Sequence, residues 1–233
     1  MGDKRLRLLR HRLINGWPLF FMITGLTLGG MITGMIMIGF STPESIVQLI
    51  RLSVRFASPW IFIAFSTSAL VVLYPGSFSK WLLRNRRYTG LSFAAGFAWQ
   101  AVFIAVLFAL YPAYYWDELH KTSDLLGRSA SYLFLFALTV TSFFPVRRRL
   151  SRAQWHWLHW IGIWYFWAAI WGTYVAQALS QNSKVADIAF TFLGLLALIL
   201  RLAANFKSRV ITSNRKGKVE KITTKDEKLA PMQ

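Results

Sequence analysis

The sequence predicts an all-α integral membrane protein, a bundle of six transmembrane helices with both termini in the cytoplasm. Of its 233 residues, 55% are hydrophobic and only 15% are charged, whereas a soluble domain carries about a quarter charged residues. The charged residues also fall in short clusters between long apolar runs. Runs of about 20 apolar residues are what a helix needs to cross a bilayer.

Six apolar runs define the expected organisation of the chain. A basic segment, residues 1–16, precedes the first run, which is too long for a cleaved secretory signal with its apolar core of about 7–15 residues. A basic tail, residues 206–233, follows the last run, and its polar composition predicts disorder. Between them lies a transmembrane domain, residues 17–205, with expected spans at 17–40, 56–74, 91–111, 129–144, 155–179 and 188–204.

The basic residues set the expected orientation. Lys and Arg number 21 in the terminal segments and the two loops on their side of the membrane, against 5 in the three opposite loops. Because positively charged loops stay in the cytoplasm, both termini are expected there. Clustered basic residues beside a membrane also attract anionic lipid, by about 1 kcal/mol per charge. The basic loops therefore either only set the topology or also bind lipid.

Composition excludes several classes of function. The chain has no cysteine, which removes disulfides, thiolate metal sites and iron–sulfur clusters. A net charge of +18 also occurs in nucleic-acid-binding proteins, but such proteins do not need six apolar runs, so the expected partner is the lipid bilayer and not nucleic acid. No catalytic residue and no metal site is predicted, because nucleophiles, bases and metal ligands are not grouped at a recognisable spacing. The apolar runs contain no Asp, Glu or Lys, which argues against an ion-coupled transporter.

Three ionisable side chains lie within the expected spans, where such a group is a candidate functional residue. Arg201 has a stem long enough to place its guanidinium at the cytoplasmic interface. His156 lies close to the start of its span, where an imidazole costs little. His159 lies one turn deeper and is the candidate for a ligand or a buried hydrogen-bond partner.

Tryptophan is concentrated in the fifth run, which holds six of the eleven. Five of them follow spacings of 3, 4, 3 and 4 residues and so form one narrow stripe on a helix. Such a stripe offers a flat surface to a quinone, a pigment, another ring-shaped ligand or a partner helix. Packing between helices of this same protein would give an identical pattern. The tryptophan stripe consists of Trp157, Trp160, Trp164, Trp167 and Trp171.

The first run contains two pairs of glycines, each four residues apart. These pairs are Gly25 with Gly29 and Gly30 with Gly34. Small residues at this spacing let a second helix approach closely in a membrane. Glycine is also common in membrane helices generally. The pairs therefore either mark a close contact between helices or reflect this general abundance.

Two motifs resemble the ferric-reductase-like transmembrane domain family. One, Arg86-Arg87-Tyr88-Thr89-Gly90-Leu91, opens the third run. The other, Arg148-Arg149-Leu150-Ser151 followed by Trp155-His156-Trp157-Leu158-His159, opens the fifth. The resemblance covers about residues 50–205 and is nearest to the haem-binding membrane subunit of the bacterial methionine sulfoxide reductase system. It implies a six-helix bundle in a bacterial cytoplasmic (inner) membrane and, in the family, b-type haem that carries electrons.

Haem ligands are the point at which this chain departs from the family pattern. The family holds haem with histidines that face each other from the third and fifth spans. The resemblance places the third-span position at Gln100 and the two fifth-span positions at His159 and near Gly172 and Thr173. A bis-histidine site needs a nitrogen donor on each face of the haem, and His159 alone matches. Haem b is therefore disfavoured, and the cofactor stays unknown.

Two functions follow as hypotheses. The first is a membrane scaffold or accessory subunit that lacks the usual haem site and docks a protein partner or an aromatic ligand through the tryptophan stripe. The alternative is an electron-transfer subunit of an oxidoreductase that binds haem b or a quinone. In either case the chain is expected to act within a membrane complex and not as an independent enzyme.

Overall fold

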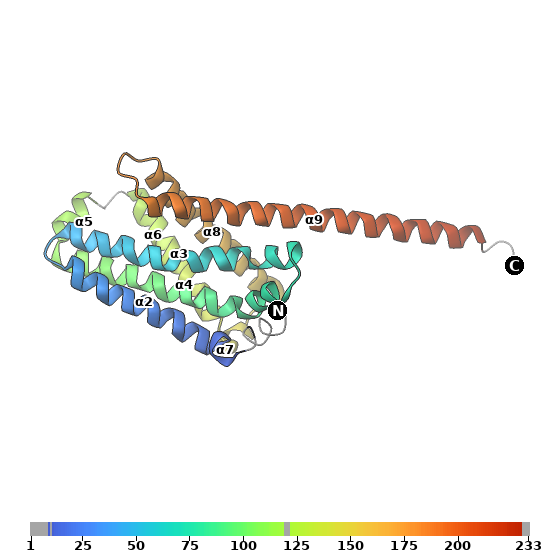
Figure 1. The fold of residues 1–233 in the computed structure, drawn as a ribbon, viewed down its shortest axis with the longest axis horizontal. Coiled ribbons are helices and arrows are strands. Elements are labelled where there is room, and N and C mark those ends of the chain that lie inside the picture. The colour runs from blue at the N-terminus through green and yellow to red at the C-terminus, as the bar shows by residue number, and fades with distance from the viewer. Residues whose placement is uncertain (1–8, 10, 119–121, 230–233) are drawn as a thin grey trace, which may run out of the picture.

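The computed structural model describes residue 9 and residues 11–118 and 122–229, and it is helical throughout, with no strand among these residues. Three long helices, α2 (Trp17–Ile38), α3 (Pro43–Leu73) and α4 (Ser77–Leu110), lie side by side. A fourth, α9 (Val185–Leu229), runs beside them and extends far beyond the other helices (Figure 1).

The remaining helices complete the bundle and its connections. Helix α6 (Thr122–Thr141) contacts α8 (Arg152–Ala178), and α8 contacts α3 and α9. Short helices stand in the connections and before α2. They are η1 (Arg12–Ile14), α5 (Pro112–Glu118) and α7 (Phe144–Arg147).

Four helices are long and apolar enough to cross a membrane: α2, α3, α4 and residues 185–212 of α9. The structure therefore supports an all-helical membrane protein in contact with a lipid bilayer. The other two expected spans also coincide with helices. In α6 the apolar part is short, residues 129–141. Helix α8 is rich in Trp and Tyr, whose apolar rings carry an N–H or O–H group, so it is less apolar by composition.

Several helices are longer than the apolar runs that predict them. Helix α3 begins at Pro43, after Thr42, whose Oγ1 accepts the Ser45 N–H at 3.2 Å. Helix α4 begins at Ser77 and so includes the basic residues expected in a loop. Proline at the first helical position and a Ser or Thr cap are helix-start signals independent of hydrophobicity. Apolar runs report the buried or lipid-facing part of a helix and not its ends.

Helix α9 continues through the basic tail, for which composition predicts disorder, as far as Leu229. The packed part of α9 supplies the costly first turns of a helix, and each further residue then adds a hydrogen bond at little cost. Side chains at residues 205–212 are mostly exposed, so this extension does not pack as the preceding turns do.

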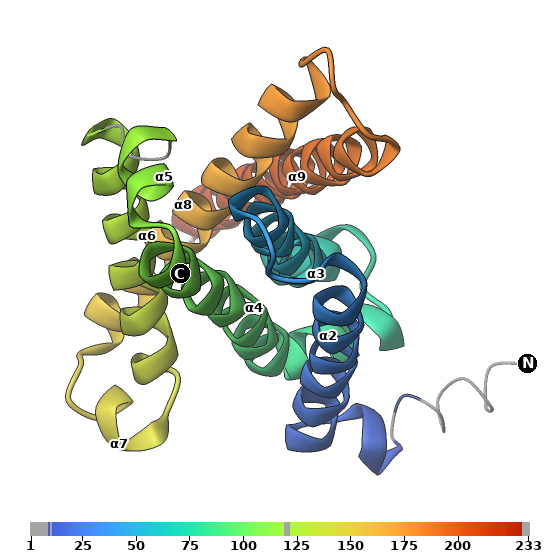
Figure 2. The same ribbon diagram turned by 90° about the vertical axis from the view of Figure 1, so that its left-hand side faces the viewer.

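Helix α3 is the centre of the bundle. It contacts α2, α4, α8 and α9, and the view along the bundle places it among these four (Figure 2). The main hydrophobic cluster combines residues of α3, α4, α8 and α9, including Phe65, Phe97 and Phe166. A second cluster joins α2, α3 and α4 around Met31, Leu49 and Phe103.

One of the two glycine pairs marks a helix contact and the other does not. A Cβ on Gly30 would overlap the Phe56 ring of α3, and a Cβ on Gly34 would overlap the Leu52 side chain. Gly25 and Gly29 have no neighbouring atom within 4 Å of an added Cβ. Small residues therefore permit the close α2–α3 approach on one face of α2 only.

We predict that Gly30→Leu destabilises the protein whereas Gly29→Leu does not. Overpacking against the Phe56 ring costs about 1–3 kcal/mol, while leucine at the open Gly29 position gains helix propensity of about 0.5–1 kcal/mol. The two residues are neighbours on one helix, so depth in the membrane is matched. Thermal unfolding in detergent, followed by tryptophan fluorescence, measures the difference. Equal melting temperatures for the two variants would contradict the α2–α3 packing described.

Candidate functional site

Two residues of the tryptophan stripe join α8 to α9 by hydrogen bonds. Trp167 is buried, and its Nε1 donates to the Gly194 carbonyl at 3.0 Å. Trp171 Nε1 donates to the Thr191 carbonyl, also at 3.0 Å. A Cβ on Gly194 would overlap the Trp171 ring, so the glycine opens the backbone of α9 to these rings. Both donors reach carbonyls, which can accept a second hydrogen bond.

Phe65 of α3 is the ring on which the middle of the stripe packs. It is fully buried and lies parallel to Trp167 at a centroid distance of 5.2 Å and 14° between planes. Trp164 meets the same ring edge-on at 4.9 Å. These offset and edge-to-face geometries are the favourable ones for aromatic pairs. The stripe is therefore anchored to α3 as well as to α9.

Arg201 of α9 turns into this aromatic cluster. Its guanidinium carbon lies 4.4 Å from the Phe65 ring centroid and 5.0 Å from that of Trp164. Its NH1 group donates to the Phe65 carbonyl at 3.0 Å. None of the acidic side chains that the structure describes pairs with it. Two ring faces and a carbonyl thus hold a cation that would otherwise be costly to bury.

The stripe divides into an inner and an outer part. Trp164, Trp167 and Trp171 pack within the protein, which is the self-packing alternative left open by the sequence. Trp157 and Trp160 are 59% and 43% exposed. Their rings meet edge-to-face at 5.5 Å, and Trp160 contacts Trp164 at 6.1 Å. The surface available to a partner or ligand is therefore the outer pair, which is continuous with the packed rings.

His159 is a hydrogen-bond partner between helices. Its Nε2 lies 3.2 Å from Thr141 Oγ1 at the end of α6. Its ring lies 4.4 Å from that of Trp155, whose Nε1 donates to the Thr141 carbonyl at 3.3 Å. His159 and Trp155 together fix the end of α6 against the first turns of α8.

Gln100 and His159 lie at different levels of the bundle. Phe97 of α4 contacts Phe166 of α8 at 5.7 Å, and the two helices run in the same direction, since each is antiparallel to α3. Gln100 follows Phe97 by three residues, whereas His159 precedes Phe166 by seven. At 1.5 Å per residue the two side chains are about 15 Å apart along the helix axes. They cannot ligate opposite faces of one iron.

The other positions that the resemblance assigns to haem ligands also offer no nitrogen donor. Gly172 has open space around its Cα, and Thr173 is exposed with Oγ1 donating to the Ala169 carbonyl at 2.8 Å. Gln100 has a buried side-chain oxygen without a hydrogen-bond partner in the described structure, but an amide oxygen is a weak ligand for haem iron. The residues present therefore do not fit a bis-histidine haem.

A polar cluster at the opposite end of α8 was not foreseen from the sequence. Arg55 NH2 of α3 pairs with Asp187 Oδ1 of α9 at 3.1 Å, and Asp187 is buried. Close by, the hydroxyl groups of Ser58 and Tyr174 share a hydrogen bond of 2.9 Å. Arg55 and Asp187 each lie one residue before an expected span, 56–74 and 188–204, and so outside the predicted membrane segments. Their opposite charge on the same side of the predicted membrane was the available signal.

Comparisons with models of protein families, with curated proteins and with solved structures find no match to this chain. Within the part of the chain that the structure describes, no group of three or more His, Asp or Glu residues could hold a metal ion.

We predict that Trp167→Leu destabilises the protein strongly whereas Trp157→Leu has little effect. The first change removes a stacked ring and a hydrogen bond to α9, a cost of about 2 kcal/mol or more. The second shortens an exposed side chain on the same helix. For a chain of this length the expected fall in melting temperature is about 4–8 °C for Trp167→Leu. The same shift for both variants, or for neither, would show that the inner stripe does not hold α8 in place.

Proposed function

We propose that this chain is an accessory subunit of a membrane complex, built on a six-span, ferric-reductase-like bundle that lacks the family's bis-histidine haem site. A protein partner binds its exposed tryptophan pair, Trp157 and Trp160. The observation that carries the proposal is the division of the stripe. Its inner rings hold the bundle together, and its outer rings are exposed and continuous with them.

Helix directions support six spans. Helix α8 is antiparallel to α3. The earlier α8 residue Trp164 lies beside the later α3 residue Phe65, and the later α8 residue Tyr174 lies beside the earlier α3 residue Ser58. Helix α9 runs parallel to α3 from Asp187 beside Arg55 onward. If α3 crosses the bilayer, its close neighbours α8 and α9 do so as well. Helix α6, antiparallel to α8, supplies the sixth crossing, and an even number returns both termini to one side.

The charge distribution favours the cytoplasm for that side. We predict that reporter fusions after Ser79 and Ser151 report a cytoplasmic address and that fusions after Thr42 and Ser183 report the opposite compartment. The 21-to-5 distribution of Lys and Arg gives this expectation. An extracytoplasmic address at Ser151 would remove a span between α4 and α8 and overturn the six-span topology.

The electron-transfer alternative is less well supported by the site. One histidine matches a haem-ligand position, and its Nε2 already faces Thr141. A quinone or another flat ligand would need rings that are free to receive it. Trp167 and Trp171 have their faces against Phe65 and each other and their N–H groups on carbonyls.

The exposed pair has the properties of a protein-binding surface. Tryptophan is enriched among the residues that dominate binding energy at interfaces. A single exposed tryptophan near the end of a membrane helix is ordinary interfacial anchoring. Here the Trp157 and Trp160 rings pack edge-to-face, and the Trp160 ring also contacts Trp164. These contacts preorganise the two rings for binding. A preorganised surface loses less side-chain entropy on binding.

We predict that the double change of Trp157 and Trp160 to Leu reduces recovery of co-purifying membrane proteins by about tenfold or more, as expected for loss of about 1.4 kcal/mol or more of binding. Quantitative mass spectrometry of the purified full chain, after mild crosslinking in membranes, measures the recovery. Trp116→Leu, which also changes an exposed tryptophan, is the control and should leave recovery unchanged.

An absorption spectrum of the same preparations distinguishes the alternative. The accessory-subunit proposal expects no stoichiometric low-spin haem in the oxidised or dithionite-reduced protein. A strong Soret band with sharp reduced α and β bands, near one haem per chain, would favour the electron-transfer subunit. Unchanged partner recovery after loss of both tryptophans would show that the exposed pair is not the binding surface.

A further inference from the structure

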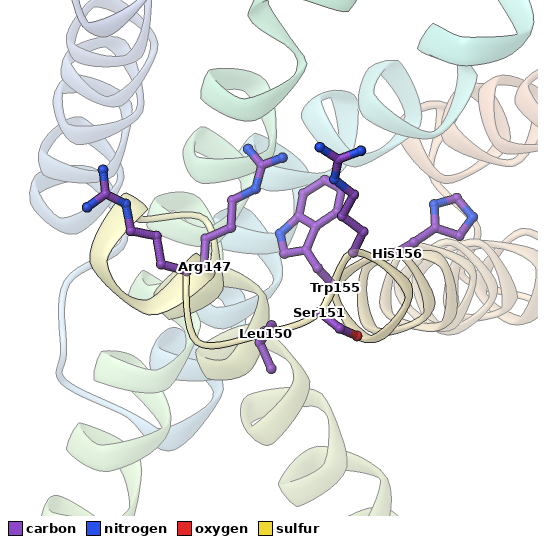
Figure 3. A pocket seen from close by; sticks show the side chains of 7 residues that line it. Arg147, Leu150, Ser151, Trp155 and His156 are labelled. Carbon is purple, nitrogen blue, oxygen red and sulfur yellow. The ribbon is translucent and has the colours of Figure 1, made fainter.

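A basic pocket lies where α7 leads into α8, apart from the tryptophan stripe. Its volume is about 460 Å³. None of its lining residues is acidic, and three are arginines. The pocket is lined by Arg147, Arg148, Leu150, Ser151, Arg152, Trp155 and His156. Figure 3 shows Arg147, Trp155 and His156 with their side chains projecting to the same side of the connection.

Arg147 is held in position by Trp155. Its guanidinium carbon lies 4.6 Å from the Trp155 ring centroid, a distance typical of a cation–π contact. Trp155 is itself fixed by its hydrogen bond to the Thr141 carbonyl and by the neighbouring His159 ring. A guanidinium stacked on a ring face keeps its in-plane N–H donors free to bind an oxyanion in bidentate geometry.

The local backbone adds to the same electrostatic character. Ser151 caps the N-terminus of α8, accepting the Gln154 N–H at 3.1 Å, while the Gln154 side chain accepts the Ser151 N–H at 2.9 Å. The other N–H groups at the start of the first turn are those that an α-helix cannot satisfy internally. Arg152 belongs to this turn and lines the pocket together with Arg147. The partial positive charge of the helix start reinforces the arginines.

The position of the pocket suggests which kind of anion it takes. It combines arginines with the apolar surfaces of Leu150 and Trp155, at the end of α8 where the helix leaves the proposed bilayer. Nearby, Phe143 and Trp157 are exposed apolar side chains at the same end. Lipid phosphates lie at this depth, with glycerol and acyl carbons next to them.

We propose that the α7–α8 pocket binds a phosphate ester, supplied by the headgroup of an anionic phospholipid on the cytoplasmic side. Arg147, oriented by Trp155, forms the bidentate contact, and Arg148, Arg152 and His156 surround the remaining oxygens. A soluble phosphate ester carries the same chemistry, and the measurement distinguishes the two sources. This proposal does not depend on the partner surface, because the pocket contains neither Trp157 nor Trp160.

The test titrates the detergent-solubilised full chain with short-chain phosphatidylglycerol and phosphatidylcholine, and counts bound lipids by native mass spectrometry. Phosphatidylglycerol is expected to bind about tenfold or more tightly than phosphatidylcholine, and Arg147→Gln to remove about tenfold in affinity, the effect of losing one charge-assisted contact. Arg149→Gln is the matched control, because it removes the same charge from the same connection at a residue that does not line the pocket. It should change affinity by less than about twofold.

Further variants keep the test decisive. Arg147→Lys keeps the charge and loses the planar fork, so its affinity should also fall. It is the informative variant should Arg147→Gln not fold, which a melting curve reports. Glycerol phosphate in place of lipid identifies a soluble source if it binds with the same dependence on Arg147. Equal losses for Arg147→Gln and Arg149→Gln, or no preference for phosphatidylglycerol, would show that these arginines act only as diffuse charge and would overturn the proposal.

Discussion

The packing around Phe65 is the interaction on which the arrangement of α3, α8 and α9 depends. One fully buried ring carries Trp167 on its face and Trp164 on its edge, while its own carbonyl receives Arg201. Lipid tails are as apolar as leucine side chains, so burial alone gives helices little reason to associate within a bilayer. Association then depends on contacts that lipid cannot replace, and ring stacking, cation–π contact and hydrogen bonds to carbonyls are of this kind. Moving any one of the three helices would break contacts of the other two.

The packing around Phe65 shows which contacts of the tryptophan stripe could be predicted from the sequence and which could not. The spacing places five tryptophans on one side of a helix, and successive rings do contact one another along α8. Trp167 and Trp171 donate to the carbonyls of Gly194 and Thr191. Backbone carbonyls have no sequence signature, so the partner of the stripe could not be read from the chain. Gly194 is a sign of this contact in the sequence, because a Cβ at that position would overlap the Trp171 ring.

The helix ends show a second limit of the sequence analysis. All-helical structure and the approximate positions of the helices follow from the apolar runs, but the runs omit the first turns of α3 and α4, where charged residues are helical. Arg55 lies in the omitted part of α3, and Asp187 lies in the first turn of α9, just before its apolar run begins. The two nevertheless form an ion pair between helices. For Arg201 the sequence shows a side chain long enough to reach an interface, but the direction of a long side chain depends on its neighbours. Phe65 and Trp164 offer ring faces to the guanidinium, and Phe65 also offers its carbonyl.

The two ends of the bundle differ in how their charged side chains are arranged. At one end the carboxylate of Asp187 neutralises Arg55 within the protein. At the other end the described residues that line the α7–α8 pocket include three arginines and no acidic side chain. The exposed tryptophans lie at this same end. At 100° per residue, the mean direction of Trp157 and Trp160 lies about 120° around α8 from that of the pocket residues Arg152, Trp155 and His156, and the two sets meet where Trp160 follows His156 by one turn. A phosphate-bearing lipid and a protein partner would thus occupy adjoining faces of α8, in contact along the line of His156 and Trp160.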